Sequence, residues 1–235
     1  MEMKVTTERS LGNKLLDVLE NVTGGRLWVL KRLMTRPTNI ASFLVLMVVV
    51  FCAIFEAVLP IPDPLEQDLR QMLLGPSSAH IFGQDYLGRD IFSRVIVGAQ
   101  IALNVGVISV GVASLVGVVC GVASGYFGKW VDNALMRVVD AFLSFPAILL
   151  ALAIAAALGA GVKAVTIAIA VVTWPYFARL VRGQVLSVRE RDFVAASLAL
   201  GASNIRIMYR HIWPSVVDPV IVQFSLTIAV SIIVE

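Results

Sequence analysis

Histidines and acidic residues, the side chains that most often transfer protons or bind metal ions, lie at the margins of the apolar runs in this 235-residue chain. Both histidines, His80 and His211, fall outside the long charge-free runs, and Glu56 and Asp218 lie at the ends of two of them. A carrier driven by protons or ions usually holds such groups in the middle of the membrane, because the coupling ion must be bound there. The sequence therefore argues against a proton-coupled or ion-coupled mechanism.

Two short motifs resemble a catalytic turn and a nucleotide-binding loop, but each lacks a residue that its chemistry needs. The segment Gly121-Val-Ala-Ser-Gly has the spacing of a nucleophile turn, but no histidine is available as the base. In Gly125-Tyr-Phe-Gly-Lys-Trp the glycine spacing differs from that of a phosphate-binding loop, and Trp130 stands where a hydroxyl would hold magnesium. Cys52 and Cys120 lie inside apolar runs without metal or redox spacing. We therefore expect no catalytic residue, bound metal or bound cofactor in this chain.

The composition is that of a membrane protein. Hydrophobic residues make up 58% of the chain and charged residues 15%, and the mean hydropathy is +0.87, whereas a soluble domain is nearer half apolar and one quarter charged. This balance excludes a disordered chain, a nucleic-acid module and a disulfide-rich secreted domain. Because about 20 apolar residues cross the hydrocarbon core, the charge-free runs predict an all-α membrane protein, a polytopic helical bundle, with helices at roughly 40–59, 101–125, 141–160, 163–180 and 217–234.

Lysine and arginine residues are concentrated in alternate segments between the predicted spans. The segment before the first span holds seven, the turn at 126–140 holds two and the loop at 179–213 holds six. The two other loops hold four together. Since cytoplasmic loops carry an excess of basic residues, we expect the N-terminus and the three basic segments on the cytoplasmic side.

The loop at 179–213 contains the pattern of a short helix that ends at a glycine. Ser187 and Glu190 have the spacing of a capping box, which predicts the start of this helix. The helix can run to Leu200, and Gly201 then suits the left-handed backbone conformation that often follows a helix end.

A second short helix is expected after Gly201. Ser203 can cap its N-terminus, and Pro214 is expected to end it and to open the last span. Its apolar residues recur at helical spacing, at Ile205, Met208, Tyr209 and Ile212.

Small side chains between Ala195 and Ala202 leave two interpretations open. Such residues are good helix formers, so the run fits an amphipathic helix on the membrane surface. They also let a backbone sit deep in a groove of another protein, with Arg189, Arg191 and Arg206 around it. On physical grounds alone the two interpretations are equally supported.

Glycines and prolines inside the predicted spans indicate how the helices pack. Gly117, Gly121 and Gly125 recur every four residues on one face of the second span, a spacing that lets another helix approach closely. We expect this face to be a helix-packing surface. Pro146 and Pro175 lie within or at the edge of the third and fourth spans, where a kink and an ordinary bend are both open.

From Arg189 to Ser203 and from Ile212 to Pro214 the sequence resembles the EAA loop of bacterial ABC-importer permeases. In that family a Glu-Ala-Ala triplet precedes a glycine by a fixed interval, and an isoleucine–proline element follows. Here Ala195 replaces the glutamate and Ser197 the second alanine, which removes the family's acidic contact with the ATPase and leaves the docking geometry. The resemblance implies a coupling loop, 187–213, that docks on an ATPase through Ala195, Ala196, Ser197, Gly201, Ala202, Ile212 and Pro214.

The resemblance covers roughly residues 35 to 235. The segment Phe82 to Arg94 is similar to the one before the second span in C-type permease subunits of dipeptide, oligopeptide and nickel importers, and Trp174 to Gly183 matches the same group. It implies the MetI-like ABC permease fold with five spans present of an expected six, so that the chain is expected to stop before the last span.

The expected organisation has three parts. Residues 1–37 form a cytoplasmic N-terminal segment, and residues 99–235 form the permease core, truncated before the last span, with the coupling loop. Residues 38–98 hold the first span and an extracytoplasmic loop. An interfacial helix is predicted in that loop at 82–94, with an apolar stripe at Leu87, Ile91, Phe92 and Val95.

The family resemblance implies a transmembrane permease subunit of an ATP-driven, binding-protein-dependent importer in the bacterial inner (cell) membrane. The implied partners are a homologous B-type permease, two ABC ATPase subunits that hold ATP and magnesium, an extracytoplasmic substrate-binding protein and the lipid bilayer, with no nucleic acid. The chain is expected to have no ATPase site of its own. Dipeptides or oligopeptides are the expected substrates, while nickel or another small solute, a secondary transporter or channel, and the nonfunctional product of a disrupted gene stay open.

Overall fold

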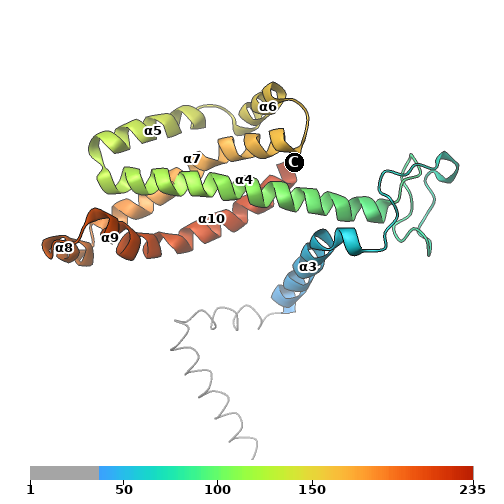
Figure 1. Cartoon of the computed structure of the whole chain (residues 1–235), viewed down its shortest axis with the longest axis horizontal. Helices are drawn as coiled ribbons and strands as arrows, with labels where there is room; N and C mark the ends of the chain where they lie inside the picture. Colours follow the sequence, from blue (N-terminus) through green and yellow to red (C-terminus); the bar gives the residue numbers. More distant parts are fainter. Residues whose placement is uncertain (1–36, 235) are drawn as a thin grey trace, which may run out of the picture. The chain divides into compact units, whose positions relative to one another are not determined.

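The computed structural model describes residues 37–234 and divides the chain into two compact units at the boundary between Ile96 and Val97. Figure 1 shows the helices of each unit. The predicted N-terminal segment, 1–37, lies outside the described residues except for Pro37. In the described part of the chain the secondary structure is helical apart from an isolated bridge between Gln84 and Asp90. The predicted all-α membrane architecture is confirmed.

The described part of the first unit begins with α3, from Pro37 to Ile54. Proline is tolerated in the first turn of a helix because the N–H it lacks would have no helical partner there. The helix stops short of the predicted end at 59, and a 3-10 turn, Glu56–Val58, follows it. Among the described residues of α3 only Ala53 is buried, so nearly all of its apolar side chains are available to lipid.

Hydrogen-bonded turns, and not a helix, precede α4. The predicted interfacial helix at 82–94 is wrong, because residues 82–90 form turns and α4 begins at Ile91. Gly83 and Gly88 have φ angles of +75° and +72°, in the left-handed region that interrupts a right-handed helix. A Cβ at Gly88 would lie 1.9 Å from the backbone oxygen of Asp68, so only glycine fits this turn.

The helix α4 runs from Ile91 to Phe127, and most of it belongs to the second unit. It starts before the predicted 101–125 because Asp90 caps it: Oδ2 accepts hydrogen bonds of 2.7 Å from both the N–H and the Oγ of Ser93. At 1.5 Å per residue, α4 is about 55 Å long, well beyond the ~30 Å hydrocarbon core. Gly128 follows its end with a φ angle of +63°.

Two helices replace the turn predicted at 126–140 and the single span predicted at 141–160. These are α5 (Lys129–Leu143) and α6 (Ala147–Leu158), which are bent by 87° relative to each other. Pro146 explains the break, because it lacks an N–H and disfavours the helical conformation of the residue before it. The 12 residues of α6 extend only about 18 Å, which is too short to cross the hydrocarbon core.

The helix α7, from Val162 to Arg189, lies at the centre of the second unit. It contacts α5, α6 and α10 and runs beside α4, as Figure 1 shows. Pro175 lies inside α7 without ending it. Because α7 continues past the predicted end at 180, Ser187 lies within a helix, and the predicted capping box is wrong.

After α7 the chain forms four helical elements, with turns before and after the first of them. These elements are α8 (Asp192–Ala199), α9 (Asn204–Ile207), a π-helical turn called η3 (Met208–Ile212) and α10 (Trp213–Val234). Pro214 does not end a helix as predicted, since the helix continues from α9 through η3 into α10. The Trp213 N–H donates to the Met208 carbonyl five residues earlier, and this wider turn accommodates the proline that follows.

Within residues 37–234, four helices are long and apolar enough to cross a membrane, namely α3, α4, α7 and the continuous helix 204–233. The bent pair α5–α6 makes a fifth if it forms one broken span. Inside the second unit, one buried cluster joins Val110 and Ala113 of α4 to Phe177 of α7. A larger one joins α4, α7, α8, α9 and α10 through Val118, Tyr126, Val181, Val185, Val188, Val194, Ile207, Ile212 and Val216.

Candidate functional site

The turn between α8 and α9 depends on a glycine. Gly201 has a φ angle of +79°, as expected for the residue after a helix end. Its N–H donates to the Leu198 carbonyl at 2.9 Å, and the Ala202 N–H donates to the Ser197 carbonyl at 3.1 Å. These two bonds make a Schellman motif, which pairs the last carbonyls of α8. The predicted left-handed glycine is therefore present, although α8 begins later than predicted.

Large apolar side chains are exposed on both sides of this turn. Leu200 is 88% exposed and Ile205 75%, and Tyr209 in η3 is 78% exposed. We call residues 190–213, which contain most of the residues predicted for docking, the docking segment, and we call Leu200, Ile205 and Tyr209, with the exposed Ala195, Ala196 and Gly201, the docking face. These side chains are available to a partner protein or to the membrane surface, the two interpretations that the sequence leaves open.

The seven residues predicted for docking do not all lie on this face. Those that are exposed are Ala195, Ala196, Gly201 and Pro214, whereas Ser197 and Ala202 are half-buried. Ile212 is fully buried in the larger cluster, so it supports the segment from below. Leu200, which is 88% exposed, was not among the residues predicted for docking, although an apolar residue directly before a turn glycine in a polar loop is a usable signal.

The underside of the docking segment packs on the helical body. Val194, Ile207 and Ile212 are each 0% exposed and join the cluster that contains Val185 and Val216. The predicted stripe is correct in part: Ile212 is buried and Met208 packs on the same cluster, whereas Ile205 and Tyr209 are exposed. The other buried residue is Ile207, five positions before Ile212. The π-helical turn accounts for this spacing of five residues, because it adds one residue to a helical turn.

A serine and a histidine link α8 to η3. Ser197 Oγ donates to the Phe193 carbonyl at 2.8 Å, and it lies 3.2 Å from His211 Nε2. The His211 ring also lies against Phe193, with 5.7 Å between ring centroids. Ser197 thus ties the two halves of the docking segment together, a role that sequence spacing did not reveal.

The three glycines of α4 lie against α7. A Cβ at Gly117 would lie 2.4 Å from Phe177 Cβ, at Gly121 2.6 Å from the Ala178 carbonyl oxygen, and at Gly125 2.8 Å from Val185 Cβ. No larger residue fits these positions without moving α7. This contact places the C-terminal half of α4 beside the half of α7 that leads into the docking segment.

Ion pairs attach α5 to α7. Arg182 donates to both carboxylate oxygens of Asp132, at 2.5 and 2.6 Å, and Ser124 Oγ of α4 donates to the same carboxylate. Arg179 pairs with Asp140 at 2.5 Å in a more exposed position. The bidentate pair is the stronger of the two, because its geometry matches the guanidinium fork and both partners are partly buried.

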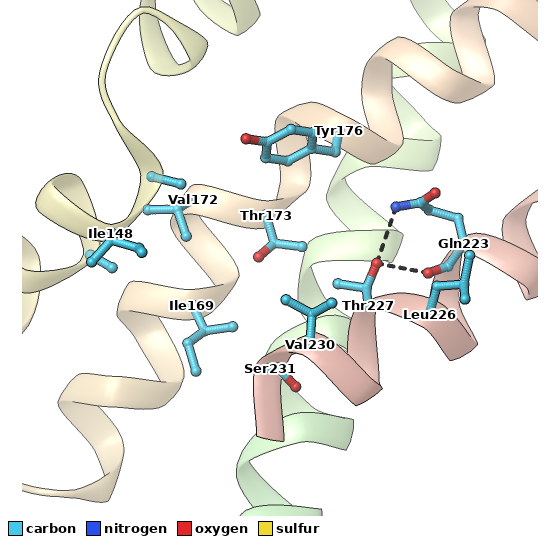
Figure 2. A pocket seen from close by; sticks show the side chains of 12 residues that line it. Ile148, Ile169, Val172, Thr173, Tyr176, Gln223, Leu226, Thr227, Val230 and Ser231 are labelled. Carbon is cyan, nitrogen blue, oxygen red and sulfur yellow. Dashed lines mark hydrogen bonds between the residues drawn. The ribbon is translucent and has the colours of Figure 1, made fainter. Parts of the chain in front are cut away.

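A pocket of about 390 Å³ lies between α6, α7 and α10 (Figure 2). Figure 2 shows Thr173 of α7 facing Gln223 and Thr227 of α10 across it. Gln223 Nε2 donates to Thr227 Oγ1 at 3.2 Å, and Thr227 Oγ1 donates to the Gln223 carbonyl at 2.7 Å. The remaining lining is Ala147, Ile148, Ala151, Ile169, Val172, Tyr176, Leu226, Val230 and Ser231.

The pocket offers neutral hydrogen-bonding groups on an apolar wall. Its polar groups are hydroxyls and one amide, and among the described residues that line it none is charged. Such a lining can accept amide and hydroxyl groups but gives a free charge no counter-ion. These polar residues could not be identified from the sequence, because they are ordinary helix positions that only the fold brings together.

Comparison with known proteins agrees with this architecture. Residues 117–234 match the family described as binding-protein-dependent transport system inner membrane component. The chain is 40% identical over 203 residues to the dipeptide transport system permease protein DppC of Alkalihalophilus pseudofirmus, which covers 86% of this chain and 67% of that protein. It is 43% identical over 159 residues to the glutathione transport system permease protein GsiD of Pectobacterium atrosepticum, covering 68% and 53%.

A third relative is the glutathione transport system permease protein GsiD of Escherichia coli O157:H7, 43% identical over 194 residues, which are 82% of this chain and 63% of that protein. The chain thus spans between about half and two thirds of the length of these relatives. The family match lies on α4 to α10, the elements that hold the docking segment and the pocket. The chain therefore belongs to the family of inner membrane components of binding-protein-dependent transport systems, in the group that includes dipeptide and glutathione permeases.

Proposed function

We propose that this chain is the C-type transmembrane permease subunit of an ATP-driven, binding-protein-dependent peptide importer. It lies in the bacterial inner membrane with its N-terminus in the cytoplasm, and it pairs with a homologous B-type permease. Two ABC ATPase subunits bind ATP and magnesium, while this chain has no ATPase site of its own. The observation that carries the proposal is the docking segment, whose Val194, Ile207 and Ile212 pack on the helical body while Leu200, Ile205 and Tyr209 are exposed.

The docking face supplies the contact with an ATPase. Leu200, Ile205 and Tyr209 are 75% to 88% exposed, and burying a large apolar side chain contributes about 1.5–3 kcal/mol. The short side chains of Ala195 and Ala196 let α8 lie close to a groove wall. Because the acidic residue of the family motif is absent, apolar contact carries this interface.

The charge distribution supports the orientation. Arg189, Arg191, Arg206 and Arg210 lie in or beside the docking segment, and basic residues concentrate on the cytoplasmic side. The docking face is therefore on the cytoplasmic side, where ATP is available. The loop before α4 is on the extracytoplasmic side, where a substrate-binding protein releases its substrate.

The pocket supports a peptide as the substrate. Hydroxyls and the Gln223 amide complement peptide N–H and carbonyl groups, and the apolar wall accepts varied side chains. A nickel ion is served better by imidazole, thiolate or carboxylate ligands. The pocket forms one wall of the path, with the partner permease opposite, and the extracytoplasmic protein does most of the selection.

Coupling follows from the geometry of the second unit. Closure of the ATPase dimer on ATP moves the docked segments, and the helices packed on them change between an inward-facing and an outward-facing arrangement. α7 and α10 line the pocket and also flank the docking segment. A displacement at the docking face therefore reaches the pocket through two continuous helices.

The test is to replace Gly201 in the complete importer. No described atom lies within 4 Å of a Cβ at this position, so Gly201→Val acts through the backbone, whose φ of +79° costs a β-branched residue roughly 1–2 kcal/mol. We expect Gly201→Val to insert into the membrane normally and to lose ATPase binding and substrate-stimulated hydrolysis. Co-purification of the ATPase subunits and phosphate release measure this outcome.

Two controls sharpen the test. Gly201→Asn keeps most of the activity because asparagine tolerates the left-handed region. Gly183→Ala, a helical position with no described atom within 4 Å of its Cβ, leaves binding unchanged. Wild-type transport in Gly201→Val would rule out the docking role of this turn.

A further inference from the structure

A buried tyrosine near the end of α4 is hydrogen-bonded to the first residue of α9. Tyr126 is 9% exposed, and its hydroxyl donates to Asn204 Oδ1 at 2.9 Å. Asn204 is the first residue of α9, immediately after the glycine turn. The bond joins residues 78 positions apart, so it attaches the start of α9 to the end of α4.

An arginine attaches the end of α7, just before the docking segment, to the same end of α4. Arg189 is the last residue of α7, and its Nη1 donates to the carbonyl oxygen of Tyr126 at 3.0 Å and to that of Gly125 at 3.4 Å. These carbonyls belong to the last turn of α4, where no further helical N–H is available to pair them. A cation is favourable there because of the helix dipole.

The two connections lie on either side of α8 and the glycine turn. Arg189 precedes α8 and Asn204 follows it, and both are held by Tyr126. Beneath them Tyr126 packs in the same buried cluster as Val194 and Ile207. The C-terminal end of α4 is therefore attached to the docking segment on both sides of α8.

We propose that Tyr126, Arg189 and Asn204 form a coupling junction that transmits displacement of the docking segment to α4. This inference rests on the proposed function, since it requires that the segment docks on an ATPase. The three are positioning residues that touch neither substrate nor nucleotide. Without the junction, the docking face would still bind, and its displacement would be absorbed at the turns around Glu190 and Gly201.

The junction can be weakened without altering the docking face. Tyr126→Phe keeps the ring in the core and removes only the hydroxyl, and Asn204→Ala removes the acceptor at an exposed position. Asn204→Asp keeps an oxygen acceptor for the tyrosine hydroxyl. Tyr86→Phe is a matched control, because Tyr86 is 65% exposed and lies in the loop before α4.

The experiment uses the complete importer in proteoliposomes with a dipeptide and its binding protein. It measures ATPase co-purification, ATP hydrolysis and peptide transported per ATP hydrolysed. We expect Tyr126→Phe and Asn204→Ala each to lower the transport-to-hydrolysis ratio by at least about fivefold, the lower end of usual coupling strengths, with ATPase binding unchanged. The double variant should lose no more than either single one, and Asn204→Asp should recover most of the ratio.

Three results would overturn the junction. They are an unchanged ratio in both single variants, additive losses in the double variant, and loss of ATPase binding in Tyr126→Phe or Asn204→Ala, which would make these residues part of docking itself. Failure of the wild-type chain to bind the ATPase is a different result, and it would overturn the proposed function.

Discussion

At the scale of single residues, Asp85 organises the loop before α4. Its carboxylate accepts hydrogen bonds from the Leu87 N–H at 2.8 Å, the Arg89 N–H at 3.0 Å and Arg89 Nε at 2.9 Å, and it also pairs with Arg94. Desolvation raises the pKa of Asp85, but the hydrogen bonds from Arg89 and Leu87 outweigh it and hold the pKa at about 2, below the usual 3.8.

This pKa predicts acid sensitivity in the loop. A carboxyl whose pKa is lowered by folding stabilises the folded loop above its unfolded pKa of 3.8, and the stabilisation is lost as pH falls through about 2. Hydrogen exchange of residues 83–90, corrected for the intrinsic rate, should therefore accelerate between pH 4 and pH 2. Asp85→Asn should exchange faster at neutral pH and lose this pH dependence; equal protection in both proteins would contradict the assignment.

At the scale of elements, the contact between α4 and α7 decides whether the bundle forms. It depends on the absence of side chains at Gly117, Gly121 and Gly125, where a Cβ would lie 2.4–2.8 Å from atoms of α7. On the same helix Gly111 has no described atom within 4 Å of an added Cβ. The same substitution at two positions of α4 therefore separates helix propensity from packing.

Gly121→Ala should destabilise the protein by about 1–3 kcal/mol, because the added methyl group meets the α7 backbone and forces the helices apart. Gly111→Ala should be neutral or stabilising by up to about 1 kcal/mol, because alanine is the better helix former. Thermal unfolding of the two variants in detergent measures the difference. Equal melting temperatures would show that α4 does not approach α7 this closely.

The sequence pattern predicted which segments are helical better than where the helices end. The charge-free runs place α3, α4, α7 and α10, because a span must be apolar whatever its partners are. The end of α7 was missed because Arg182 and Arg189 find their partners, Asp132 and the α4 carbonyls, only in the folded bundle. Local spacing then made Ser187 resemble a cap.

The docking segment, too, could be predicted from the sequence only in part. Gly201 could be predicted, since a left-handed turn after a helix selects glycine by itself. Of the inward-facing residues, Met208 and Ile212 were in the predicted stripe. Ile207 could not be predicted, because the π-helical turn at 208–212 spaces the two buried isoleucines five positions apart. The pocket and the Tyr126–Asn204 bond join distant helices, so no local pattern indicates them.

At the scale of the whole molecule, the second unit combines an apolar outer surface, a neutral pocket and a docking face at one end of its helices. The docking segment adjoins α7 and α10, the two helices that also line the pocket. An importer needs this arrangement, because the free energy of ATP binding must reach the substrate path without an ATP site in the permease. The central claim is therefore that the docking face binds an ATPase.

Site-specific photo-crosslinking in the complete importer tests that claim most directly. A photoreactive phenylalanine analogue replaces Leu200, which is 88% exposed on the docking face, or Leu115, which is 68% exposed on α4. If the docking face binds an ATPase, the analogue at position 200 forms an adduct with the ATPase subunit and the analogue at position 115 forms none. An adduct at both positions, or none with the ATPase from position 200, would contradict the claim.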